Sequence, residues 1–372
     1  MKPKKIKSII LQGYLHDANF GDILSGYLFY KRCQNAGFQK IDFFQFRNLG
    51  IGDFFRKQTG YTVKKNLLSC LKSDAFVIIS GGSFWNDKRN PHDALVRFAR
   101  FIFPALIYQL RHKPVYILGV GGGPVDTLWL RKKMIKVINK SKIVTFRDDS
   151  TKKIFDDYGV KKKTVVTADT MLTIRKEMLD PFEESEKLNK IAEGRKKILL
   201  HLPDGVNENS CVADKILPGL IQFLCEHKEY LLVISNDNKR ELGEEEKYQN
   251  ERIRILLKDA ALNFYEYKYH DSWQMCSLIN EMDCVITLKL HVGVVSCALG
   301  KSVVSFPVHR EKTDNFYRMI NQSERCINMR KLEKEMVYGQ LCRFINQPVF
   351  ISEELRTEAE KNLAALDQII EK

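Results

Sequence analysis

The sequence has few of the patterns that mark exported, membrane-spanning or metal-binding proteins. Its nine cysteines include no C-x-x-C pair, and its eight histidines show neither H-x-H nor H-x-x-x-H spacing, so no zinc site is predicted. No apolar segment of the signal-peptide type precedes Gln12, and the most apolar later stretch, 101–110, is too short to cross a bilayer. We therefore expect a cytoplasmic protein with free thiols and no metal or other cofactor.

Acidic side chains are outnumbered: there are 46 Asp and Glu against 60 Lys and Arg, which gives a formal net charge of +14. Such an excess predicts acidic partners. The chain has no basic block interleaved with aromatic residues, so nucleic acid is a poorer candidate than phosphorylated small molecules or an anionic membrane surface. The basic clusters at 136–142 and 161–163 are interpreted as solvated edges.

Short apolar runs alternate with longer amphipathic segments. The runs are 7–13, 75–82, 114–123 and 142–148, then 198–203, 230–237, 263–267, 284–290 and 302–308. This alternation predicts parallel sheets covered by helices. Because 372 residues exceed the usual size of one core, we predict two doubly wound α/β domains, at 1–180 and 195–345, with a charged linker near 175–195. A C-terminal helix within 346–372, capped by Ser352, should pack on the body.

Ligands of open α/β sheets bind beyond the carboxyl ends of the strands, and the first half has suitable residues there. Asn19 and Asp22 flank a glycine before a predicted helix, whose N-terminal amides can receive an anion; the alternative is a turn and helix cap only. Arg147 follows a predicted strand and offers a planar fork that suits carboxylate or phosphate; the alternative is an ion pair with Asp148.

Glycine runs follow two further strands of the first half. Gly82 and Gly122 lie in these runs, where missing side chains let the backbone approach a ligand or a neighbouring loop. The second run does not match G-x-G-x-x-G, because Pro124 stands at the sixth position. A dinucleotide site is therefore not predicted.

In the second half, a lysine and a histidine interrupt an apolar stretch within LKLHVG, residues 288–293. Lys289 and His291 are separated by one residue, so they project the same way from a continuing strand or its exit. Arg310 and Lys312 follow the next predicted strand. Four basic or titratable side chains on neighbouring strand ends predict an anion pocket. The alternatives are a hydrogen-bonded core histidine and a lysine that extends to solvent.

In their order and spacing, these motifs resemble those of the polysaccharide pyruvyl transferase family along nearly the whole chain. They are N-F-G-D at 19–22, the glycine runs at 80–83 and 119–124, R-D-x-S at 147–150, A-D at 168–169, K-L-H at 289–291, A-L-G-K-S-V-V at 298–304, and Lys312. The resemblance implies a GT-B-like fold, with two Rossmann-like domains facing a cleft. It also implies transfer of pyruvate from phosphoenolpyruvate to a sugar as a ketal. The N-terminal domain would take the acceptor and the C-terminal domain the donor.

By the resemblance, Asn19, Arg147, His291 and Lys312 match positions implicated in the reaction. We expect His291 to be the general acid that protonates phosphoenolpyruvate, and Arg147 and Lys312 to bind its anionic groups and stabilise the departing phosphate. Substrate contacts are expected from Asn19, Asp22, Gly82, Gly122, Lys289 and Arg310. The family usually has an arginine where this chain has Lys289, which replaces a bidentate fork by a point charge.

Acceptors in this family are often carried on a lipid diphosphate. Work at the inner membrane face, in exopolysaccharide or capsule synthesis, would suit a net-basic protein. The segment 96–113 either contacts lipid or is an ordinary helix that covers the sheet.

Two other functions are open. One is a GT-B glycosyltransferase that uses a nucleotide sugar, whose retaining members often hold the donor with an acidic residue in the C-terminal domain. The chain has no Asp or Glu between Asp283 and Glu311, which counts against this alternative. The other is a non-catalytic module that binds sugar phosphates and needs the cations but no proton donor.

Overall fold

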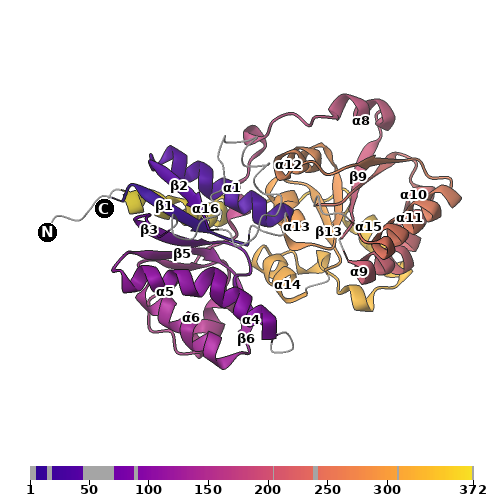
Figure 1. The fold of residues 1–372 in the computed structure, drawn as a ribbon. Coiled ribbons are helices and arrows are strands. Elements are labelled where there is room, and N and C mark those ends of the chain that lie inside the picture. Colours follow the sequence, from indigo (N-terminus) through magenta and orange to yellow (C-terminus); the bar gives the residue numbers. More distant parts are fainter. Residues whose placement is uncertain are drawn as a thin grey trace. The chain divides into compact units, whose positions relative to one another are not determined.

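The computed structural model describes residues 6–14, 19–44, 71–87, 91–203, 205–237, 242–307 and 310–370. The chain forms two compact units: unit 1 consists of residues 1–173 with 352–372, and unit 2 of residues 174–351 (Figure 1). Each unit is built on a parallel sheet, which confirms the prediction of two Rossmann-like α/β domains. Among the residues with a described structure, no helix is both long and apolar enough to cross a membrane.

Unit 1 has a six-stranded sheet in the order β2-β1-β3-β5-β7-β8. Its strands are β1 (Ser8–Gln12), β2 (Lys40–Phe43), β3 (Ala75–Ile79), β5 (Val115–Val120), β7 (Val144–Phe146) and β8 (Val165–Val166), and all pairs are parallel. The chain adds β2 on one side of β1 and then returns to add β3 on the other side. The topological switch point therefore lies between β1 and β3, where a ligand site is expected at the carboxyl ends.

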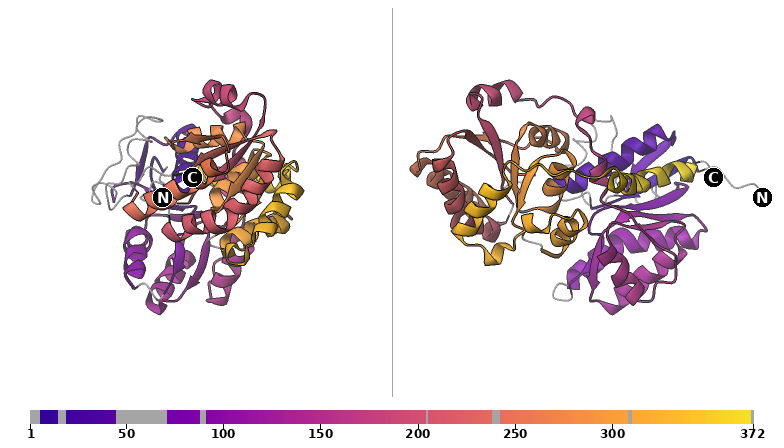
Figure 2. Two further views of the ribbon diagram at one scale, coloured as in Figure 1. Left: turned by 90° about the vertical axis from the view of Figure 1, so that its right-hand side faces the viewer. Right: turned by 180° about the vertical axis from the view of Figure 1, so that it is seen from behind.

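Helices cover both faces of this sheet because its central strands are buried and apolar (Figures 1 and 2). On one face lie α1 (Phe20–Asn35) and α16 (Glu353–Ile370). On the other lie α4 (Pro91–Arg97), the π-helical turn η1 (Phe98–Ile102), α5 (Phe103–Leu110) and α6 (Leu128–Lys140). The other elements in the described part of unit 1 are the short parallel pair β4 (Phe84–Asn86) and β6 (Gly122–Val125), the helix α7 (Asp149–Asp157) and the 3₁₀ turn η2 (Thr170–Thr173).

Unit 2 has a five-stranded parallel sheet in the order β11-β10-β9-β12-β13. The strands are β9 (Lys196–His201), β10 (Tyr230–Ser235), β11 (Phe264–Tyr267), β12 (Cys284–Thr287) and β13 (Ser302–Ser305). The helices are α8 (Ser185–Ala192), α9 (Val206–Cys211), η4 (Val212–Ile216), α10 (Leu217–Glu226), α11 (Glu244–Asp259), α12 (Ser272–Glu281), α13 (Leu290–Ala298), α14 (Arg310–Met319) and α15 (Lys334–Phe344). Short 3₁₀ turns are η3 (Lys176–Met178), η5 (Ser323–Arg325) and η6 (Met329–Lys331). Here the switch point lies between β9 and β12.

The segment that we expected to be a linker, 175–195, belongs to unit 2, and the division falls at 173/174 rather than near 180. Phe182 is buried, and its ring lies 5.1 Å from that of Tyr267. Ser277 also donates a hydrogen bond to the carbonyl of Asp180 at 2.7 Å. The segment is mostly charged, which is typical of a linker. A few apolar residues are nevertheless enough to fasten it to unit 2.

The C-terminal helix α16 is part of unit 1 rather than a separate segment beginning at 346. The buried Asn362 accepts hydrogen bonds from Thr145 Oγ1 at 2.7 Å and Thr167 Oγ1 at 3.0 Å, and donates to the carbonyl of Ala168 at 2.9 Å. Ser352 Oγ accepts from the N–H of Leu355 at 3.3 Å, as expected for a cap. These buried polar contacts fix the helix to the ends of β7 and β8.

Candidate functional site

Asn19 and Asp22 lie at the switch point of unit 1. Asn19 caps α1, because its Oδ1 accepts a hydrogen bond from the N–H of Gly21 at 3.1 Å. Asp22 is in the first turn of α1 and lies against the turn after β3: a Cβ added to Gly81 would be 3.3 Å from Asp22 Oδ1. Gly81 has a φ of +68°, a left-handed conformation that favours glycine. The capping role is therefore observed, and a ligand role for either residue stays a prediction.

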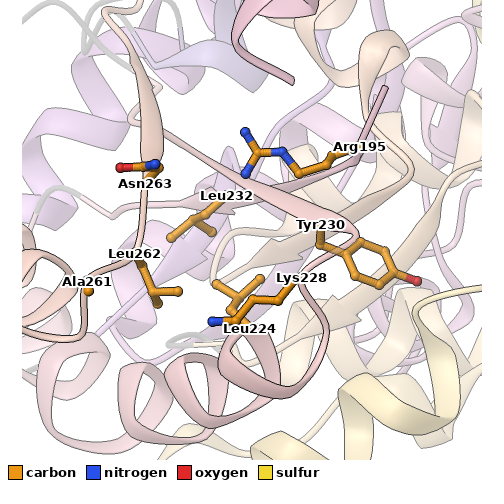
Figure 3. A pocket seen from close by; sticks show the side chains of 8 residues that line it. All are labelled: Arg195, Leu224, Lys228, Tyr230, Leu232, Ala261, Leu262 and Asn263. Atoms are coloured by element: carbon orange, nitrogen blue, oxygen red, sulfur yellow. The ribbon is translucent and has the colours of Figure 1, made fainter. Parts of the chain in front are cut away.

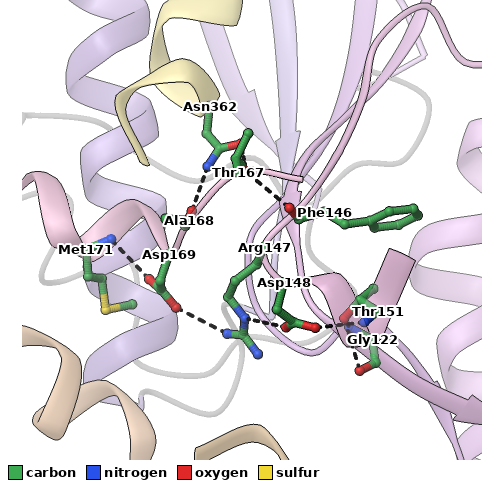
Figure 4. Close-up of polar contacts among 10 residues, drawn as sticks. All are labelled: Gly122, Phe146, Arg147, Asp148, Thr151, Thr167, Ala168, Asp169, Met171 and Asn362. Atoms are coloured by element: carbon green, nitrogen blue, oxygen red, sulfur yellow. Dashed lines mark hydrogen bonds and ion pairs between the residues drawn. The ribbon is translucent and has the colours of Figure 1, made fainter. Parts of the chain in front are cut away.

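Arg147 follows β7 and is buried between two carboxylates (Figure 4). Its Nη1 lies 3.3 Å from Asp169 Oδ2 and its Nε 3.7 Å from Asp148 Oδ2. Both carboxylates are fixed in turn: Asp169 accepts from the N–H of Met171 at 3.0 Å, and Asp148 caps α7 by accepting from the N–H of Thr151 at 2.7 Å. The expected pair with Asp148 is present, but Asp169 makes the closer contact. Two of the three guanidinium nitrogens of Arg147 therefore face carboxylates.

Gly121 makes room for that guanidinium. A Cβ added there would lie 2.5 Å from Arg147 Nη2, closer than non-bonded atoms approach. Within the described residues, Nη2 has no hydrogen-bond partner, whereas Nε and Nη1 face carboxylates. The glycine run after β5 thus brings backbone close to a side chain of the same unit.

The two glycines that were predicted to contact substrate, Gly82 and Gly122, have structural partners. The carbonyl of Gly82 accepts a hydrogen bond from Arg97 Nη1 at 2.9 Å. The N–H of Gly122 donates to Thr151 Oγ1 at 2.9 Å, and a Cβ there would lie 2.8 Å from the carbonyl oxygen of Phe84. Close packing of β4, β6 and α7 therefore accounts for Gly122, and its contact with substrate stays a prediction.

In unit 2, three neighbouring strands bring a buried polar cluster to the carboxyl edge of the sheet. Asp237 follows β10 and is 1% exposed. Its Oδ1 lies 2.5 Å from Lys289 Nζ and 3.5 Å from His201 Nε2. His201 ends β9, and its Nδ1 lies 3.4 Å from the hydroxyl of Thr287 at the end of β12. We call His201, Asp237, Thr287 and Lys289 the strand-end cluster.

Asp237 is held as a carboxylate by its neighbours. Burial alone would raise its pKa, but the charge and the hydrogen bond of Lys289, together with the nearby His201, outweigh burial and lower the pKa. A buried anion of this kind is stable only with its cationic partners in place.

The expectation that Lys289 and His291 share one strand is wrong. The strand β12 ends at Thr287, and Lys289 is the N-cap of α13 with φ −112° and ψ 141°. His291 therefore lies in the first turn of α13, and the direction of its side chain follows helical rather than strand periodicity. The side chain of Lys289 turns to Asp237, while that of His291 is half-buried.

Lys312 lies in the first turn of α14, directly after β13, and is half-buried. Because β12 and β13 are parallel neighbours, α13 and α14 begin at the same edge of the sheet. Gly293 lets the two helices pack closely, since a Cβ there would lie 2.7 Å from Tyr317 Oη. Arg310 begins α14, but its side chain lies outside the described structure, so nothing tests its role.

One pocket of unit 2 is unrelated to these residues (Figure 3). It is lined by Arg195, Lys228 and Asn263, each of which immediately precedes or closely precedes a strand. The pocket is therefore at the amino edge of the sheet, opposite the strand-end cluster. In the described part of the chain, no three His, Cys, Asp or Glu side chains gather as a metal would require.

Comparison with known protein families decides the classification. The family model of polysaccharide pyruvyl transferases matches residues 19–310. The chain belongs to the polysaccharide pyruvyl transferase family. The match begins at Asn19 and spans the strand-end cluster and His291, whereas Lys312 lies just beyond its end. No curated protein sequence matches this family member.

Solved structures with the same fold come from other enzymes. The UDP-GlcNAc 2-epimerase of Neisseria meningitidis aligns with a TM-score of 0.61 and 10% identity, covering 98% of each chain. That of Methanocaldococcus jannaschii aligns with a TM-score of 0.60 and 12% identity, covering 91% of this chain and 92% of that one. At such identities the likeness shows the GT-B-type fold alone.

Sequence reasoning missed His201 and Asp237, although His201 lies within the apolar run 198–203 and Asp237 ends the run 230–237, both of which are predicted strands. It also gave no role to Asp169, which it had noted only within a motif. The signal was available: a polar residue at the carboxyl end of a buried strand is a site candidate in this pyruvyl transferase fold.

Proposed function

We propose that this transferase moves the pyruvyl group of phosphoenolpyruvate onto two hydroxyls of a sugar acceptor, in the synthesis of a cell-surface polysaccharide or exopolysaccharide. Membership of the family supports a transferase in polysaccharide synthesis. The observation that carries the choice of donor is the edge of unit 2, where His291 and Lys312 stand in the first turns of two adjacent helices. Helix N-termini and cations together suit a ligand with both a carboxylate and a phosphate.

In this mechanism His291 donates a proton to the methylene carbon of phosphoenolpyruvate. The neighbouring carbon becomes electrophilic, and a sugar hydroxyl adds to it. The bond to phosphate then breaks, a second hydroxyl closes the ketal, and the two hydroxyl protons leave with the phosphate and the regenerated His291. One phosphoenolpyruvate and one sugar diol thus give one ketal and one phosphate.

The remaining residues serve binding. Lys312 and Arg310 are proposed to hold the donor anions and stabilise the leaving phosphate. Lys289 is 22% exposed and its ammonium can donate up to three hydrogen bonds, so its ion pair with Asp237 is compatible with a donor contact. In unit 1, Asn19 and Asp22 are proposed to orient the acceptor, and Arg147 to present Nη2 to an anionic group. No metal or other cofactor enters this scheme.

A nucleotide-sugar glycosyltransferase is the second candidate, because structures with this fold contain such ligands. The Neisseria enzyme was solved bound to UDP-GlcNAc, and an Anabaena protein with a TM-score of 0.52 and 11% identity, aligned over 98% of this chain and 95% of its own, was solved with UDP and glucose. Asp237 supplies the acidic residue that the stretch 283–311 lacks. It is buried and paired with Lys289 and His201, however, so it is poorly placed to accept hydrogen bonds from a ribose or sugar.

The deciding experiment is incubation with phosphoenolpyruvate and a panel of nitrophenyl and lipid-linked sugars. We expect phosphate release matched by a product heavier by one pyruvate minus water. Thermal unfolding supplies a second readout: phosphoenolpyruvate should stabilise the protein more than UDP-GlcNAc, because a ligand that binds only the folded state raises its stability. A larger shift with UDP-GlcNAc would favour the glycosyltransferase. Donor binding without turnover on any acceptor would favour a binding module.

A further inference from the structure

The helices α4, η1, α5 and α6 form a layer on one face of unit 1 (Figure 2). This layer exposes an unusual share of apolar side chains. Five of the eleven large hydrophobic residues exposed in the described structure belong to it: Leu95, Phe103, Leu110, Leu128 and Trp129. Three aromatic rings are contiguous, because Phe98 lies 5.5 Å from Trp129 and 6.0 Å from Phe103 between ring centroids. Trp129 is nevertheless 42% exposed and Leu128 58% exposed. This layer therefore covers the sheet and also presents apolar surface outward.

The same layer is strongly basic. The helix α6 reads LWLRKKMIKVINK and contains no acidic residue. Lys132, Lys133, Lys136 and Lys140 are exposed, and the first two lie three and four residues after Trp129, hence beside it on the helix surface. The outer face of α6 thus passes from aromatic and leucine side chains directly to lysines.

The structure also joins the two basic clusters that looked like separate solvated edges in the sequence. Asn139, near the end of α6, accepts hydrogen bonds from the N–H groups of Lys161 at 2.8 Å and Lys162 at 3.0 Å. Residues 161–163 are thereby fixed next to the end of α6, and Lys161 and Lys163 are exposed. We call the outer face of α6 with residues 161–163 the α6 surface.

We propose that the α6 surface docks this protein on an anionic phospholipid bilayer. Tryptophan and leucine side chains enter the boundary between headgroups and acyl chains, while neighbouring lysines contact lipid phosphates. Clustered lysines at such a boundary add attraction to anionic lipids. Docking does not depend on which donor the enzyme uses. If the proposed function holds, docking would bring the enzyme to acceptors carried on lipid.

Other occupants fit this surface less well. A symmetric dimer through the α6 surface would place the patch against its own copy, and so lysines against lysines. Nucleic acid would use the lysines and Trp129, but it would leave Leu128 without a stacking partner. Acidic residues occur nearby on α7, where Asp156 pairs with Lys152, but none lies on α6 itself.

The test is co-sedimentation of the full chain with vesicles of phosphatidylcholine alone or mixed equally with phosphatidylglycerol. We expect binding to the anionic vesicles only, weakened by salt, with a blue shift of Trp129 fluorescence. The triple variant Lys132→Gln, Lys133→Gln, Lys136→Gln should bind on the order of 100-fold more weakly. Its matched control neutralises three exposed lysines of unit 2, at positions 258, 331 and 334. For the apolar part, Trp129→Ser should weaken binding about 10-fold, and Phe350→Ser, at an 84% exposed site of unit 2, should not.

Several results would overturn the proposal. Equal loss of binding in both triple variants would show that vesicle binding depends on the net charge of the protein and not on the α6 surface. Absence of binding to anionic vesicles at low salt would remove docking altogether. A concentration-dependent dimer that Trp129→Ser abolishes would make the α6 surface a contact between copies, and tighter binding to single-stranded nucleic acid than to vesicles would make it a nucleic-acid site.

Discussion

Replacing Asp237 by alanine removes the carboxylate that joins the strand ends of unit 2. The pair is close and shielded: Asp237 is 1% exposed, Lys289 22% exposed, and Oδ1 lies 2.5 Å from Nζ. Two unit charges at that separation attract by roughly 7 kcal/mol at an effective dielectric constant of about 20, much of which the desolvation of the carboxylate offsets. Removing one partner of such a pair costs about 3–5 kcal/mol, because the other charge stays buried without compensation.

The assay is a double-mutant cycle of Asp237→Ala, Lys289→Met and both together. Urea unfolding of unit 2 can be followed by Trp273 fluorescence in a background in which the other two tryptophans, Trp85 and Trp129, are phenylalanine. Trp273 is buried in α12, so its signal reports unit 2. We expect each single variant to lose several kcal/mol and the double variant to lose about 2 kcal/mol less than their sum.

The same pair predicts a pH dependence. The folded-state pKa of Asp237 is lowered relative to the unfolded state, where a free Asp titrates near 3.9. A lowered folded pKa gives stability that is present above the unfolded pKa and is lost as the pH falls through the folded one. The difference between wild type and Asp237→Ala should therefore be constant from about pH 7 to 5 and shrink below about pH 4. Additive single variants, or a difference that does not change with pH, would refute the ion pair as the source of stability.

Three further variants test the site. His291→Gln should lower turnover about 10²–10⁴-fold while folding persists, since it removes the titratable proton; unchanged turnover would transfer the acid role to another group. Lys289→Arg should keep the ion pair and leave the Michaelis constant for phosphoenolpyruvate equal or lower, because it restores a forked cation; a clear rise would contradict a donor contact there. Gly121→Ala should destabilise unit 1 by about 1–3 kcal/mol, because the new Cβ would lie 2.5 Å from Arg147 Nη2. The control is Gly339→Ala in α15, where a Cβ meets nothing within 4 Å and alanine should stabilise the helix by about 0.5–1 kcal/mol rather than destabilise it.

The alternation of apolar runs predicted the strands and the two α/β sheets because burial on both faces leaves a continuous signal in the sequence. The end of β12 was less visible, since Leu288 is buried and extends the apolar run past Thr287. The direction of the Lys289 side chain depends on the order of the strands in the sheet, not on the local sequence. The order β10-β9-β12 places residue 237 beside residue 289, and a search for acids between 283 and 311 could not find that neighbour.

Polar contacts between distant segments were equally hidden. Asn362 is one asparagine within an amphipathic helix, and nothing in its local sequence shows that it meets Thr145, Thr167 and Ala168. Phe182 is likewise one ring in a charged segment, yet it fastens the start of unit 2. Such contacts depend on tertiary packing, which periodicity does not encode.

The strand ends of the two units differ in what they offer an anion, and from this difference we infer that unit 2 is the donor side. In unit 1, Arg147 lies between Asp148 and Asp169, so carboxylates already engage its Nε and Nη1, and Nη2 is left to receive an anion. In unit 2, His291 and Lys312 stand in the first turns of helices, where the backbone amides favour negative charge. A donor that carries both carboxylate and phosphate gains most where the surrounding field is positive, and a neutral sugar acceptor gains most where carboxylates can accept its hydroxyl protons.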